Sequence, residues 1–224
     1  LIWKGDSGIE IQPFYSENNI VIPPIYPAKP WRNCEYVQEN DTQKAIVLAK
    51  EGLLKGAEAV HFKIENGAKF DLELVSSEFN LDTTLLFEVE VGAVALAESI
   101  SKCINLKGAI LIHDMEELLE VAQLIRNHPK MGLIIGSEKR ESTQEALVSI
   151  LTDLEYILLK LEDNPSFKHN IYLKNHINTN YFFEIAKLRA IRLLWQGLNQ
   201  KHGLKNSGKI RLLSELEIGE VKGT

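Results

Sequence analysis

Two polar residues at the end of one apolar run have types and spacing that could support acid–base chemistry. His113 and Asp114 directly follow the run 109–112, Ala-Ile-Leu-Ile. If this run is a strand of a parallel sheet, the pair lies at its carboxyl end, where barrel enzymes build their active sites, and Asp114 could tune His113 as a base. Asp114 also suits the N-cap of a following helix, with Glu116 and Glu117 in the first turn, where the helix dipole favours anions. We therefore interpret Asp114 as a cap in preference to a catalytic residue.

A second set of polar residues alternates with apolar residues along three short segments. Its members are His61, Lys63, Glu88, Glu90, Tyr172 and Lys174. Successive side chains of a strand point to opposite faces, so each segment is predicted to be a strand with one polar face. If the apolar faces pack under helices, the polar faces point into the interior of a barrel, where charges are stable only when paired. We expect Lys63 to contact Glu88 or Glu90 there.

The remaining histidines and the two cysteines do not predict a metal site. The histidines at 61, 128, 169, 176 and 202 show neither His-x-x-x-His nor a carboxylate-paired spacing. Cys34 and Cys103 lie far apart and are expected to pack as small apolar groups rather than act as nucleophiles.

The composition is typical of globular proteins: 224 residues, 45% hydrophobic and 25% charged. Acidic residues outnumber basic ones, 31 to 25, and the net charge of -6 offers no basic face for nucleic acid. No apolar run approaches the roughly 20 residues that span a bilayer. We therefore expect neither nucleic acid nor a membrane as partner, and the low cysteine content favours the cytoplasm.

Strand and helix patterns alternate along most of the chain. Helical spacing of apolar residues predicts helices over 42–56, 93–103, 115–127, 147–161 and 181–198. Strands are predicted over 59–64, 85–91, 109–112, 132–136 and 170–174. Residues 65–81 show only a weak pattern, compatible with a long loop or an extra hairpin. The alternation favours an α/β protein with a parallel sheet, either doubly wound or a TIM-barrel-like (β/α)8 fold with missing or irregular units.

The beginning of the chain differs from the rest. Five of the seven prolines lie within residues 1–38, and each fixes its own φ and disfavours helix at the residue before it. We expect residues 1–38 to form an extended, proline-rich N-terminal arm and residues 39–224 to form one barrel-like domain.

Three stretches resemble the methylmalonyl-CoA mutase family. Residues 8–15 read Gly-Ile-Glu-Ile-Gln-Pro-Phe-Tyr, similar to the family's Gly-Ile-x-x-x-Pro-Leu-Tyr. Residues 26–36 place Tyr, Lys-Pro-Trp and Cys-Glu-Tyr where catalytic chains carry Tyr, Arg-Pro-Trp and Arg-Gln-Tyr. Residues 180–195 follow the family's Asn-Phe-Phe-x-Glu-x-Ala-Lys-Leu-Arg-Ala-x-Arg-x-Leu-Trp closely. The resemblance implies an acyl-CoA-binding (β/α)8 barrel.

Departures from the family imply that this chain is not the catalytic one. The family's cobalt-ligand motif Asp-x-His-x-x-Gly has no counterpart, and its active-site Gly-Tyr-His-Met is replaced by Gly-Ser-Glu-Lys-Arg at 136–140. The chain therefore resembles the small subunit of an adenosylcobalamin-dependent mutase that interconverts methylmalonyl-CoA and succinyl-CoA. Its partner would be the larger catalytic subunit, which binds the adenosylcobalamin. We expect this chain alone to bind no cofactor and to be inactive.

The resemblance also marks individual residues. Tyr26 stands where a tyrosine touches substrate in catalytic chains, although a tyrosine among prolines often simply packs its ring. The residues expected at the subunit interface or in structural ion pairs are Trp31, Glu184, Lys187, Arg189 and Arg192. Glu184 and Lys187 are three residues apart and can pair on one helix.

We make two further predictions, one about ligand binding in the barrel interior and one about the surface of the last long helix. In the family the lumen holds the CoA tail, whereas paired charges would plug it here, so we expect no CoA ester to bind. The helix over 181–198 is apolar on nearly every side, which predicts a partner over its outer face. The alternative is an independent acyl-CoA-binding or enzymatic barrel without cobalamin, which an open lumen ringed by polar side chains would favour.

Overall fold

The computed structural model describes residues 3–4, 10–11, 31–136, 143–160, 171–177, 181–202 and 211–216. Within the first 30 residues it describes two short strands, β1 (Trp3–Lys4) and β2 (Glu10–Ile11), which pair antiparallel. The rest of the predicted arm up to residue 30, including Tyr26, lies outside the described residues.

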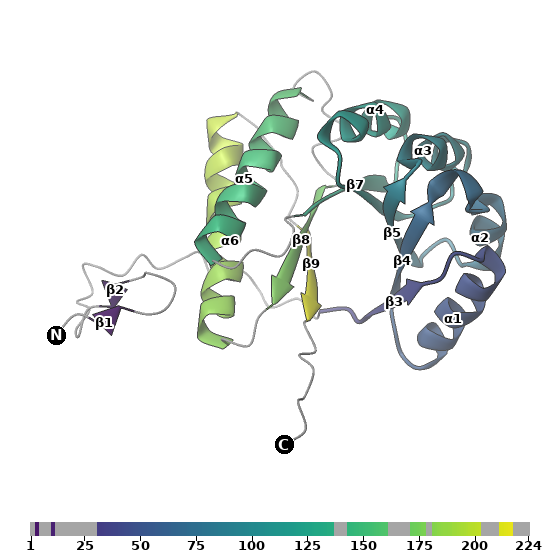
Figure 1. Ribbon diagram of the computed structural model, residues 1–224, viewed down its shortest axis with the longest axis horizontal. Coiled ribbons are helices and arrows are strands. Elements are labelled where there is room, and N and C mark those ends of the chain that lie inside the picture. Colours follow the sequence, from purple (N-terminus) through teal and green to yellow (C-terminus); the bar gives the residue numbers. More distant parts are fainter. Residues whose placement is uncertain are drawn as a thin grey trace.

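Seven parallel strands form one curled sheet (Figure 1). In spatial order, which is also chain order, they are β3 (Cys34–Gln38), β4 (Ala59–Asn66), β5 (Thr84–Val91), β6 (Gly108–Ile112), β7 (Met131–Gly136), β8 (Ile171–Ile177) and β9 (Arg211–Leu216). Each strand pairs in parallel with the next. The sheet is therefore a half-barrel, and the predicted parallel α/β class is confirmed.

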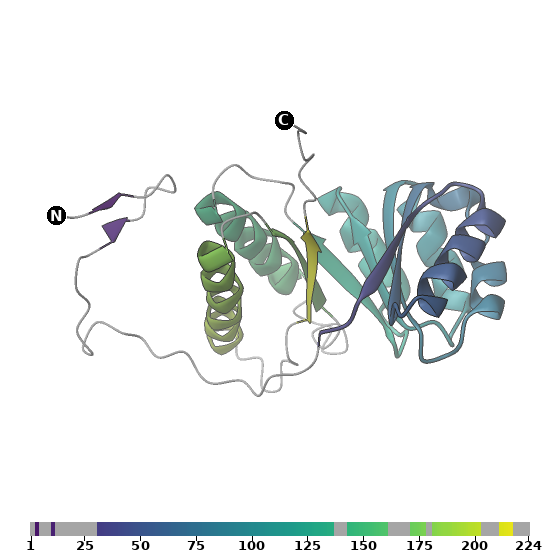
Figure 2. The same ribbon diagram turned by 90° about the horizontal axis from the view of Figure 1, so that it is seen from below.

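In the part of the chain that the structure describes, six α-helices connect the strands. They cover the convex face of the sheet (Figures 1 and 2). They are α1 (Thr42–Leu54), α2 (Leu72–Glu78), α3 (Ala93–Lys102), α4 (Met115–Ile125), α5 (Thr143–Lys160) and α6 (Tyr181–Lys201). Three of them begin at an aspartate whose side chain accepts backbone N–H groups of the first turn: Asp41, Asp71 and Asp114. These caps satisfy donors that a helix start leaves without partners.

The alternation of side chains along the strands produces two cores of different size. The large core lies between sheet and helices and holds the apolar strand residues, such as Phe62, Phe87 and Ile110. The concave face carries a small apolar cluster, Leu86, Ala109, Leu111 and Ile134. The helix-covered face thus buries most of the apolar surface and leaves the polar positions of the strands on the concave face.

The structure differs from the sequence-based expectations at three places. Cys34–Gln38 lies within the predicted N-terminal arm, but in the structure it pairs with β4 as the edge strand of the sheet. The sheet therefore begins earlier in the chain than the sequence predicts. Within the unassigned stretch 65–81, a 3-10 turn at Gly67–Lys69 and α2 occur instead of a hairpin. Strand β9 follows α6 and was not predicted, because apolar and polar residues do not alternate in Arg211–Leu216.

Among the described residues, no helix combines the length and apolar character needed to span a bilayer.

Candidate functional site

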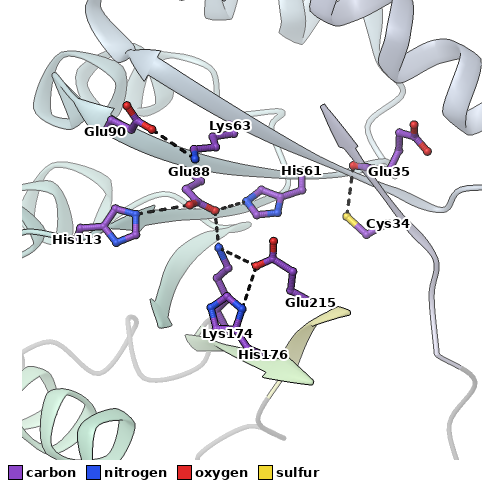
Figure 3. A network of polar contacts seen from close by, with 10 residues as sticks. All are labelled: Cys34, Glu35, His61, Lys63, Glu88, Glu90, His113, Lys174, His176 and Glu215. Carbon is purple, nitrogen blue, oxygen red and sulfur yellow. Dashed lines mark hydrogen bonds and ion pairs between the residues drawn. The ribbon is translucent and has the colours of Figure 1, made fainter. Parts of the chain in front are cut away.

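A cluster of ionisable side chains occupies the concave face of the half-barrel, with the buried carboxylate of Glu88 on β5 at its centre (Figure 3). Lys174 Nζ donates to Glu88 Oε2 at 2.7 Å, and His61 Nε2 lies 3.2 Å from the same oxygen. On the other side, His113 Nε2 lies 3.5 Å from Glu88 Oε1. Glu88, His61 and Lys174 are 5%, 5% and 7% exposed, so the centre of the cluster is shielded from water.

The cluster extends from Lys174 on β8 to the last strand. Lys174 Nζ also lies 3.2 Å from Glu215 Oε2 on β9, and His176 Nδ1 lies 3.5 Å from the same oxygen. One ammonium group therefore stands between two carboxylates, and Lys174 links three strands, β5, β8 and β9 (Figure 3).

Curling of the sheet brings these residues together. Strands β5 and β8 are separated by β6 and β7, a distance of about 14 Å in a flat sheet with ~4.8 Å between strands. Curling shortens this distance across the concave face, so that one lysine can reach one glutamate. A glycine, Gly136 on β7, lies beside Lys174 in the register. A Cβ atom at Gly136 would stand 3.0 Å from Lys174 Cβ and 3.5 Å from its Cδ, so the missing side chain provides the space along which Lys174 runs.

The contacts determine the ionisation of the central groups. Burial alone would raise the pKa of Glu88, but His113, His61 and Lys174 together outweigh it and hold that pKa well below its usual range. Tyr36 on β3 packs edge-on against His61, with ring centroids 5.2 Å apart. Burial and the nearby carboxylates Glu88, Glu215 and Glu90 raise the pKa of Tyr36 to about 12. Its hydroxyl is therefore protonated at neutral pH.

His113 is the member of the cluster that combines a carboxylate contact with water access, since half of its side chain is exposed. It follows β6 at the carboxyl end of the sheet, as the sequence predicted. Asp114 is engaged elsewhere: its carboxylate accepts the N–H groups of Glu116 and Glu117 and caps α4. The capping interpretation is thus confirmed, and the carboxylate beside His113 is Glu88.

The predicted contact of Lys63 with a glutamate is also present. Lys63 Nζ lies 3.4 Å from Glu90 Oε1, but the side chains are 28% and 48% exposed, so this pair lies at the rim. Glu88, the other glutamate that the prediction allowed for Lys63, pairs with a different lysine. Its partner is Lys174, because the curl of the sheet brings β8 opposite β5.

The charged residues of α6 separate into a buried pair and exposed arginines. Lys187 Nζ lies 2.7 Å from Glu184 Oε2, so the predicted pair forms, and it is buried inside the domain. Lys187 also donates to the carbonyl oxygen of His176 at 2.6 Å, which ties α6 to the end of β8. Arg189 and Arg192 are exposed.

The other predicted site residues stand apart from the cluster. Trp31 is 89% exposed. Cys34 lies on β3 against the apolar concave cluster, and burial, followed by Glu35, raises the pKa of its thiol to about 12. Such a thiol is a poor nucleophile at neutral pH.

No three ligand-type side chains among the described residues are placed to hold a metal ion. A cobalt ligand would need an accessible imidazole, and of the described histidines His113 alone is exposed, with its Nε2 directed at Glu88. The described residues therefore do not fit a cobalamin site of their own. What the cluster can do chemically is hold paired charges in a shielded setting and present the half-exposed imidazole of His113 beside a carboxylate.

No family model matches the chain, and no curated protein does either.

Sequence reasoning missed two members of the cluster and one residue that accommodates it. His176 continues the alternation of Tyr172 and Lys174, which the predicted strand ended too early to include. Glu215 lies on the unpredicted strand β9. Gly136 ends a predicted strand, and its role became visible only once Lys174 was placed beside it.

Proposed function

We propose that the chain is the small, non-catalytic barrel subunit of an adenosylcobalamin-dependent methylmalonyl-CoA mutase, and that it acts by pairing with the larger catalytic chain. The motif at residues 180–195 supports this proposal, as does the curled parallel sheet, whose topology suits a (β/α)8 barrel. In the complex, interconversion of methylmalonyl-CoA and succinyl-CoA would be the task of the partner, which would also hold the cobalamin.

The observation that carries the non-catalytic assignment is the ion cluster on the concave face. A lumen that accepts a pantetheine tail needs free space along its axis, whereas Glu88, Lys174 and His61 fill the centre of this face and are nearly inaccessible. Separating the buried pair to admit a ligand would expose unpaired charges in an apolar setting, at a cost of about 3–5 kcal/mol. We therefore propose that no CoA ester binds in this half-barrel.

Helix α6 supports a subunit interface. One stripe of the helix is buried against the domain, including Ile191 and Trp195. Tyr181 and Phe182 at its start are 69% and 80% exposed, and Arg192 is exposed as well. Aromatic residues and arginine are both enriched in protein interfaces.

Native mass spectrometry of the chain co-expressed with a catalytic mutase subunit tests the proposal. We expect a 1:1 complex, weakened by Arg192→Glu. The matched control is Lys102→Glu, a charge reversal at the end of α3 and far from α6 in the sequence, which should leave assembly unchanged. Absence of a complex, or equal effects of both reversals, would contradict the proposal.

Spectral titration of the isolated chain with adenosylcobalamin tests the cofactor assignment. We expect no shift of the corrin absorption, because the described residues do not fit a cobalt ligand site. A micromolar complex would overturn the assignment of cobalamin to the partner alone.

A second candidate function, an independent acyl-CoA-binding or enzymatic barrel, is favoured by one observation. His113 is a half-exposed imidazole backed by a buried carboxylate at the carboxyl end of the strands, which is an arrangement suited to a general base. Calorimetry with methylmalonyl-CoA separates the two candidates, since tight binding to the purified chain would favour this second one.

A further inference from the structure

The joint between the end of β8 and the start of α6 holds polar groups that are buried on the helix-covered side of the sheet. Lys174 and His176 point to the concave face, where both contact Glu215 (Figure 3). Asn175 lies between them in β8 and therefore points to the opposite face, as Leu173 of the large core does. Asn175 is 1% exposed, so its amide group is enclosed beneath the helices.

The amide nitrogen of Asn175 has no protein partner. Its Nδ2 atom is fully buried, and nothing in the described part of the chain accepts a hydrogen bond from it. A buried donor without a hydrogen bond has lost its hydration without compensation, and native proteins pair nearly all such groups with protein or with ordered water. The position of Asn175 therefore points to a polar neighbour that the polypeptide does not supply.

Two charged side chains of α6 lie at the same joint. Lys187 Nζ donates to the carbonyl oxygen of His176, the residue after Asn175, at 2.6 Å. Lys187 Nζ also lies 2.7 Å from Glu184 Oε2. That carboxylate oxygen is fully buried and, among the described residues, accepts no directed hydrogen bond. One ammonium group thus stands between a carboxylate with spare acceptor capacity and the strand position next to Asn175.

The chemistry of these groups selects one class of occupant. An anion would be repelled by the carboxylate of Glu184, whereas a cation would be repelled by the ammonium of Lys187 and cannot accept from the amide of Asn175. A neutral molecule that both donates and accepts satisfies all three groups. Glu184 and Lys187 are each 4% exposed, and this enclosure limits the molecule to the size of water.

We propose that this joint is a binding site for one buried water molecule, which accepts a hydrogen bond from Asn175 Nδ2, donates one to the carboxylate of Glu184 and lies beside Lys187. Buried waters typically have about three polar partners, and these residues supply that number. The water joins the end of β8 to the first two turns of α6 and adds to the direct contact of Lys187 with the carbonyl of His176. The inference does not depend on the subunit role proposed above.

Magnetic relaxation dispersion of the water signal tests this site on the full chain, because it counts the waters that stay bound for longer than the protein takes to tumble. We expect Asn175→Leu, which replaces the amide by an apolar group of similar shape, to hold one such water fewer than the wild type. Asn127→Leu is the matched control, since Asn127 is exposed, and it should leave the number unchanged. Equal numbers in the wild type and Asn175→Leu would overturn the proposal.

Two measurements on the wild-type chain keep the proposal falsifiable if Asn175→Leu fails to fold. The side-chain amide protons of Asn175 should show a nuclear Overhauser effect to water with the sign of a long-lived contact. A crystal structure should place an ordered water within hydrogen-bond distance of both Asn175 Nδ2 and the carboxylate of Glu184. Absence of the Overhauser effect, or a direct hydrogen bond from Asn175 Nδ2 to Glu184, would refute the water site.

Discussion

The side chain of Lys174 runs past Gly136 to reach Glu88, two strands beyond. Gly136 and Lys174 are partners in the register of β7 and β8, and a Cβ atom at Gly136 would approach Lys174 to 3.0 Å. Because Gly136 has no side chain, it leaves space in which the long side chain of Lys174 can cross the concave face.

Replacing Glu88 by glutamine should destabilise the fold by about 3–5 kcal/mol, because it leaves the buried ammonium of Lys174 without its closest partner. Urea unfolding at pH 7 measures the change in free energy. Glu90→Gln is the matched control, with the same substitution two residues along the same strand, at a half-exposed rim position. It should cost no more than about 1 kcal/mol. Equal losses in the two variants would show that burial of Glu88 has no energetic role.

Replacing Gly136 by valine should destabilise the protein by about 1–3 kcal/mol through overpacking, because the new side chain would occupy the path of Lys174. A double-mutant cycle with Lys174→Ala measures the coupling between the two positions. We expect the cost of Gly136→Val to fall when Lys174 is shortened. A cost that is the same in both backgrounds would mean that Lys174 does not depend on Gly136.

Stability should fall in acid through Glu88. Its folded pKa lies below the ordinary carboxyl value of about 4.3, so its contribution is fully present above that value and is lost as the pH falls towards the folded pKa. Unfolding curves of the wild type between pH 6 and pH 3 should therefore be steeper in pH than those of Glu88→Gln. Glu90→Gln should follow the wild type. A Glu88→Gln variant with the wild-type acid slope would refute the depressed pKa.

Replacing Gly108 by alanine should prevent stable folding. A Cβ atom there would stand 1.6 Å from the carbonyl oxygen of Leu85 in β5, and backbone atoms of a central strand cannot move aside. Thermal unfolding followed by circular dichroism measures the loss. Gly197→Ala in α6 is the control, since its Cβ would meet nothing within 4 Å, and it should raise stability by about 0.5–1 kcal/mol through helix propensity.

Local patterns in the sequence determined many of the strands and helices of this protein and the faces of its strands. The period of two at 59–64 and 85–91 predicted strands with one apolar and one polar face, and the structure places Phe62 and Phe87 in the core and Glu88 on the concave face. Asp114 marked the start of a helix. These features were predictable because the direction of strand side chains and the capping of a helix depend on residues within a few positions along the chain.

Only the tertiary structure decided which charges meet. Glu88 and Lys174 are far apart in the sequence and lie on strands that do not pair, so no spacing along the chain could connect them. Their contact depends on the curl of the sheet, which is a property of all seven strands and the helices packed on them. The same curl brings Glu215 towards Tyr36 from the opposite edge. Sequence determined which residues face the concave side, whereas the pairs formed there follow from long-range geometry.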